Sequence, residues 1–121
     1  MKRRTWNSLN RPIVGTVVEL NRYIVGKRHK AKKCLQYDYI DDIIKKCAIL
    51  FQYALRQLNG KDYVRRTLEL TEEITTQSYL VAALGGFVPK EVAHIERLCD
   101  QITDMVVRIS KSPMSESSHE A

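Results

Sequence analysis

The residues with the clearest chemical potential form a basic cluster between Gly26 and Cys34. Five cations and one histidine fall within these nine residues: Lys27, Arg28, His29, Lys30, Lys32 and Lys33. Lysine and arginine neutralise phosphates, and Tyr23, Tyr37 and Tyr39 lie nearby in the sequence as aromatic rings on which bases can stack. The cluster therefore predicts contact with a nucleic acid or with an acidic protein. The alternative is a solvated basic face that serves only solubility.

The distribution of charge along the chain extends this candidate interface. The 121 residues carry a net charge of +6. Up to Gln36, ten Lys and Arg residues stand against the single acid Glu19, a net charge of +9, whereas the rest of the chain has ten basic and thirteen acidic residues, a net charge of −3. Arg22 belongs to the basic part, and a second basic group follows: Lys45, Lys46, Arg56, Arg65 and Arg66. All these residues are predicted to bind nucleic acid, RNA more than DNA, or a polymerase.

No pattern in the sequence indicates catalysis or a metal site. Glu91-x-x-His94 has the spacing of one ligand pair in a di-iron bundle, but such a site needs a second Glu-x-x-His and two further Glu residues. Cys34, Cys47 and Cys99 form no CxxC pair, and no Gly-rich phosphate loop is present. We therefore expect a protein that is not an enzyme and that uses no metal or cofactor.

The elements that position these residues are predicted to be helices, and the longest apolar pattern runs from Ile40 to Leu58. Apolar residues recur there in steps of four and three: Ile40, Ile44, Cys47, Phe51, Ala54 and Leu58. This spacing places all six on one stripe of an α-helix. A stripe about 30 Å long must be covered by other helices. Seven residues are predicted to be buried in the resulting core: Ile44, Cys47, Phe51, Ile74, Ile95, Ile102 and Val106.

A first helix is expected to precede this central helix. Asn10 is its expected N-cap, Pro12 lies in its first turn, and Gly26 is its expected stop. The pattern leaves open where the central helix begins. Asp38 is a capping signal, and an earlier start near Ala31 is the alternative.

Two further helices are expected after the central one. Asn59-Gly60 predicts the end of the central helix, and a third helix is expected from Tyr63 to Leu84. Pro89 is expected to begin a fourth helix, because proline favours the first helical turn. The predicted fold is therefore all-α, an antiparallel up-down-up-down four-helix bundle.

The expected organisation is one bundle domain between two terminal segments. Residues 10–110 form the bundle, residues 1–9 a basic arm, and residues 111–121 a Ser-rich tail that is predicted to be disordered. No run approaches the roughly 18 apolar residues of a membrane span, and no signal-peptide core follows Met1. We therefore expect a cytoplasmic protein without membrane contact.

The central helix carries more apolar surface than one bundle core requires. Ile43, Leu50 and Leu55 widen its stripe, and Tyr53 lies outside it. Surplus apolar surface of this kind is typical of a contact between proteins. The sequence therefore predicts a homo-oligomer.

With these features, the chain resembles a known family of small helical proteins. The features are the four expected antiparallel helices, the basic segment Lys27-Arg28-His29-Lys30 before the second helix, and the turn Leu84-Gly-Gly-Phe-Val-Pro-Lys-Glu91 between the last two. They are similar to those of the four-helix-bundle proteins that include the accessory variability determinants of diversity-generating retroelements and the S23-type rRNA intervening-sequence proteins.

The resemblance implies a function that composition and spacing alone do not. In the retroelement branch, such proteins form basic, barrel-like pentamers that bind a reverse transcriptase and its template RNA in mutagenic retrohoming. For this chain, the resemblance implies a nucleic-acid-binding accessory protein in a ring-like homo-oligomer, with a pentamer as the first expectation. Two alternatives remain: an rRNA intervening-sequence-type protein, or a structural oligomer with no nucleic-acid role. The acidic C-terminal part departs from the retroelement pattern.

Overall fold

The computed structural model of the protein describes residues 11–111, and all regular structure in this range is helical. In chain order the helices are α2 (Pro12–Arg28), α3 (Lys33–Leu35), the π-helix η1 (Gln36–Ile40), α4 (Asp41–Leu58), α5 (Val64–Ala83) and α6 (Pro89–Lys111). The predicted all-α fold is confirmed for this part of the chain. Within it, no helix is both long and apolar enough to cross a membrane. The predicted arm, the Asn10 N-cap and the predicted tail, except Lys111, lie outside the described residues.

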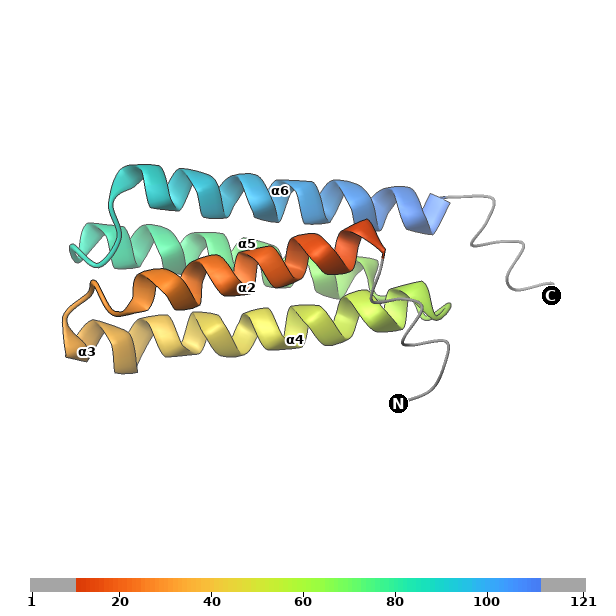
Figure 1. Ribbon diagram of the computed structural model, residues 1–121. Coiled ribbons are helices and arrows are strands. Elements are labelled where there is room, and N and C mark those ends of the chain that lie inside the picture. Colours follow the sequence, from red (N-terminus) through yellow and green to blue (C-terminus); the bar gives the residue numbers. More distant parts are fainter. Residues whose placement is uncertain (1–10, 112–121) are drawn as a thin grey trace.

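The four long helices lie side by side, with α3 and η1 leading into α4 (Figure 1). Both α2 and α5 pack against α4 and α6. Figure 1 shows the α2–α3 link and the α5–α6 turn at one end of the bundle, and the α4–α5 turn at the other. We call the first of these ends, formed by residues 29–37 and 84–88, the linker end.

The buried face of α4 is rotated slightly from the predicted one. From the end of η1 onward, its buried residues recur in steps of three and four: Ile40, Ile43, Cys47, Leu50, Ala54 and Gln57. Ile44 and Phe51 are only partly buried and pack against the edge of the core, so their predicted burial is wrong. The other five predicted core residues are buried: Cys47, Ile74, Ile95, Ile102 and Val106.

The cause of this difference lies at the end of α4. The predicted stripe and the buried stripe are both apolar as far as Ala54. Beyond it, the predicted stripe continues to the apolar Leu58, whereas the buried stripe continues to the polar Gln57. Gln57 is nevertheless only 8% exposed, because its Oε1 accepts a hydrogen bond from the Tyr63 backbone N–H at 2.7 Å. A buried polar group with such a partner is well tolerated. Apolar spacing alone therefore favoured the wrong stripe.

Glycine ends α4, as predicted, and also α5, but it does not end α2. Gly60 and Gly85 have φ values of 90° and 87°, which glycine adopts without strain. Both take part in the paired backbone hydrogen bonds of a Schellman motif. Gly26 lies inside α2, which continues to Arg28, so the predicted stop is wrong. A glycine inside a helix costs only about 1 kcal/mol relative to alanine, which the packing of α2 outweighs.

The second helix begins close to the earlier of its two predicted starts. Residues 33–58 are helical without a break through α3, η1 and α4. Asp38 lies inside η1 and is not an N-cap. Only residues 29–32 are non-helical between α2 and α3. The basic cluster is therefore divided among the end of α2, a four-residue link and the start of α3.

Two glycine-to-alanine substitutions should have opposite effects on stability. A Cβ at Gly26 would meet nothing within 4 Å, so Gly26→Ala should raise the free energy of unfolding by about 0.5–1 kcal/mol through better helix propensity. At Gly86 a Cβ would lie 2.6 Å from Val81 Cγ1, so Gly86→Ala should lower the free energy of unfolding by about 1–3 kcal/mol. Urea unfolding of both variants measures the difference. Equal midpoints would contradict the close approach of Gly86 to Val81.

Candidate nucleic-acid interface

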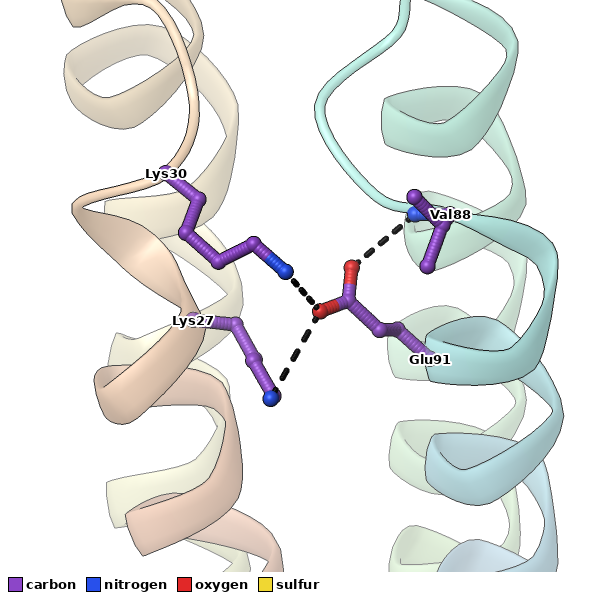
Figure 2. Close-up of polar contacts among 4 residues, drawn as sticks. All are labelled: Lys27, Lys30, Val88 and Glu91. Carbon is purple, nitrogen blue, oxygen red and sulfur yellow. Dashed lines mark hydrogen bonds and ion pairs between the residues drawn. The ribbon is translucent and has the colours of Figure 1, made fainter.

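Two cations of the basic cluster are held by one buried acid (Figure 2). Lys30 Nζ lies 2.9 Å from Glu91 Oε2, and Lys27 Nζ lies 3.7 Å from the same oxygen. The Glu91 side chain is only 3% exposed, whereas those of Lys27 and Lys30 are 34% and 48% exposed. These ion pairs join the end of α2 and the link to the start of α6. They also offset the positive charge that the two lysines offer to a ligand.

The place of Glu91 follows from the way α6 begins. Pro89 is the first residue of the helix, so Glu91 lies in its first turn, where free backbone N–H groups favour a carboxylate. Glu91 Oε1 accepts a hydrogen bond from the Val88 N–H at 2.9 Å, as in a capping box. Burial alone would raise the pKa of Glu91, but the Val88 N–H and the two lysines outweigh burial and hold that pKa below its ordinary value. Glu91 is thus a structural anion.

Arg28 is paired with the first residue of α4. Its Nε donates to Asp41 Oδ1 at 2.6 Å and its Nη2 donates to Oδ2 at 3.1 Å, a bidentate contact. The hydrogen bond from Arg28 is the main cause of the lowered pKa of Asp41. The guanidinium also lies over the Tyr37 ring, 5.6 Å from its centroid. Arg28 therefore joins α2 to η1 and α4, and its charge is balanced by Asp41.

The other members of the cluster face solvent. His29, Lys32 and Lys33 are exposed, and none of them has an ion-pair partner among residues 11–111. Arg22, about two turns before the end of α2, is exposed and likewise unpaired within this range. Lys32 and Lys33 therefore carry the positive charge of the linker end that no acid among residues 11–111 balances.

The second basic group is divided along the bundle. Lys46 on α4 is paired with Glu73 at 3.1 Å. Near the α4–α5 turn, Arg56 donates to the Tyr63 hydroxyl at 2.9 Å, and the guanidinium of Arg66 lies 5.0 Å from the centroid of the same ring. Four members are exposed and have no ion-pair partner in the described part of the chain: Lys45, Arg56, Arg65 and Arg66. The second group therefore does not gather around one contact surface.

Glu91-x-x-His94 is not arranged as a metal-binding pair. Glu91 is occupied by its lysines, and the partly buried His94 packs on Tyr23 with 4.4 Å between ring centroids. His94 Nδ1 also lies 3.1 Å from Arg97 Nη1. Within residues 11–111, no group of three or more His, Cys, Asp or Glu residues could hold a metal ion.

All three cysteines are free thiols. Cys34 is exposed on α3, whereas Cys47 and Cys99 are buried. Burial raises the pKa of Cys47 to about 12 and that of Cys99 to about 11. Such thiols stay protonated at neutral pH and behave as small apolar side chains.

The sequence pattern indicates the cations of the interface but not the acids that hold them. Asp41 is 13 residues from Arg28, and Glu91 is 61 residues from Lys30, so no local spacing links either pair. The one available signal is the place of Glu91 in a turn begun by proline, which favours a carboxylate bound to the helix start.

No protein-family model, no curated protein and no solved structure matches this chain.

Proposed function

We propose that this protein is a non-enzymatic accessory protein that binds nucleic acid, RNA in preference to DNA, through the linker end. One observation carries the proposal: in a cluster whose other cations are paired with Glu91 and Asp41, Lys32 and Lys33 are exposed and have no acid partner among residues 11–111. A phosphate bound by these two lysines releases counterions without breaking an internal ion pair. The linker end is therefore a surface suited to a polyanion.

The resemblance to accessory variability determinants favours the same function. In that role the partners of the protein are a reverse transcriptase and its template RNA, and the protein acts in the cytoplasm. A non-enzymatic role also agrees with Glu91 being occupied by lysines and with the inert thiols of Cys47 and Cys99. The rRNA intervening-sequence-type protein is the alternative within the same fold.

The proposed assembly is a ring of antiparallel up-down-up-down bundles, with five copies as the first expectation. A groove between α2 and α4 supports it, because its lining is mainly apolar or small and includes Val18, Val25, Gly26, Ala48 and Phe51. Val25 is 50% exposed in a single chain, and a second copy would cover it. Light scattering distinguishes such a ring from a single chain of 14.0 kDa.

Replacing both Lys32 and Lys33 with glutamine should weaken RNA binding and flatten its salt dependence. Each phosphate contact contributes about −0.7 to −0.9 to the slope of log affinity against log salt concentration. Loss of two contacts should therefore make the slope shallower by about 1.4 to 1.8. Anisotropy titrations of a labelled RNA at several salt concentrations measure both quantities.

The matched control replaces two exposed cations near the opposite end of the bundle, Lys61→Gln with Arg65→Gln. This control should leave the affinity and the slope unchanged. Weaker binding by the control alone would place the interface at the second basic group, and unchanged binding by both variants would refute the proposal. Substitutions of the paired cations are unsuitable, because they also remove internal ion pairs.

A further inference from the structure

We infer, building on the proposed function, that Tyr37 is a stacking platform for an unpaired base, so that the linker end selects single-stranded over double-stranded RNA. Tyr37 lies in η1 and is 62% exposed, more than any other large apolar or aromatic side chain in the described chain. An aromatic ring held in water at the surface is available to a partner with a flat apolar face. Nucleic-acid bases are such partners, and stacking on a protein ring is how single strands are held.

The ring of Tyr37 has a cation on one side. The Arg28 guanidinium lies 5.6 Å from its centroid, and Arg28 is itself fixed by two hydrogen bonds to Asp41. Because Tyr37 is 62% exposed, most of it remains open to solvent beside this contact. A cation–π contact favours one orientation of the ring before binding, and a ring that is already oriented loses less rotational freedom when a base stacks on it. The internal pairing of Arg28 thus serves the site by orienting Tyr37 rather than by contacting phosphate.

The two unpaired lysines are placed to hold the strand that carries this base. Lys33 precedes Tyr37 by four residues in a continuous helical segment, about one turn, and Lys32 is adjacent to it. Cations that follow a nucleic-acid backbone beside an exposed aromatic ring are typical of sites for single strands. In a duplex the bases are already stacked on one another, so only the lysines contribute. The difference between the two RNA forms therefore rests on Tyr37.

Tyr37→Ala should weaken the binding of a short oligoadenylate about 5- to 150-fold, the range expected for one lost stack, and leave the affinity for an RNA duplex of equal length unchanged. Tyr37→Trp should retain single-strand binding, because indole also offers a flat face. The matched control is Tyr79→Ala, since Tyr79 is 51% exposed on α5 and donates a hydrogen bond to Glu96 at 2.8 Å. This control should bind both RNAs as the parent does. Anisotropy titrations at one salt concentration measure all four proteins.

The outcomes separate this inference from the function on which it rests. Equal weakening of both RNAs by Tyr37→Ala, or no weakening of either, would overturn the stacking platform and leave the role of Lys32 and Lys33 intact. Binding of neither RNA by the parent would overturn both. Circular dichroism of Tyr37→Ala should match that of the parent, because most of the side chain lies outside the packed interior.

Discussion

Replacing Leu50 with alanine should lower the free energy of unfolding by about 2–5 kcal/mol, the range for a buried leucine. Leu50 is 0% exposed and lies on the core side of α4 between Cys47 and Ala54, which are also buried. The deletion removes apolar atoms from a close-packed interior that cannot fully collapse around the space left. Chemical unfolding followed by circular dichroism measures the loss.

The adjacent residue supplies the control for this prediction. Phe51→Ala removes a larger side chain, but Phe51 is only partly buried at the edge of the core and should cost less than Leu50→Ala. The opposite order would mean that the buried stripe of α4 runs through Ile44, Phe51 and Leu58. The pair therefore tests the rotation of α4 and not merely the presence of a core.

Glu91→Ala should lower the free energy of unfolding by about 3 kcal/mol, the lower end of the range for breaking a buried ion pair. The carboxylate is almost fully buried and accepts hydrogen bonds from the Val88 N–H and from Lys30. The lower end applies because Lys27 and Lys30 remain partly exposed and regain water when the acid is lost. Thermal or urea unfolding at neutral pH measures the change.

The contribution of Glu91 should depend on pH in the direction set by its lowered pKa. Because the pKa is lower in the folded protein than its ordinary value of 4.5, the stabilisation is fully present above 4.5 and is lost as the pH falls through the folded-state value. The stability difference between the parent and Glu91→Gln should therefore shrink in acid. Glutamine keeps an acceptor for the Val88 N–H, so this variant isolates the charge. A difference that stays constant with pH would contradict the ion pairs.

The helices and most of their ends were predictable because they depend on neighbours in the sequence. Gly60 and Gly85 adopt conformations that favour glycine, and Pro89 occupies the first helical position that suits it. Gly26 was predicted to end the first helix because it follows an apolar pattern, a place where glycine often ends a helix. Nothing in the surroundings of Gly26 forces α2 to end there, and the helix continues to Arg28. The burial of Gln57 depends on a hydrogen bond across the next turn, which no apolar pattern records.

The candidate interface was predictable in composition but not in organisation. Counting cations identifies the cluster, but it does not separate Lys30, which is bound to an acid 61 residues away, from Lys32, which has no acid partner in the described chain. That separation depends on how α6 packs beside the end of α2. The exposure of Tyr37 was equally hidden, because it depends on the position of η1 at the linker end and on Arg28 lying over one side of the ring.

The three thiols can report how often the helix bundle opens in the native protein. Cys34 can react with an alkylating reagent in the folded state and would carry a label beside Lys33, within the linker end. Cys47 and Cys99 can react only when the helices separate, because burial both shields them and keeps them protonated. The slow rate at which the second and third thiols become modified therefore measures how often the bundle opens, and the fast first step records only access to its surface.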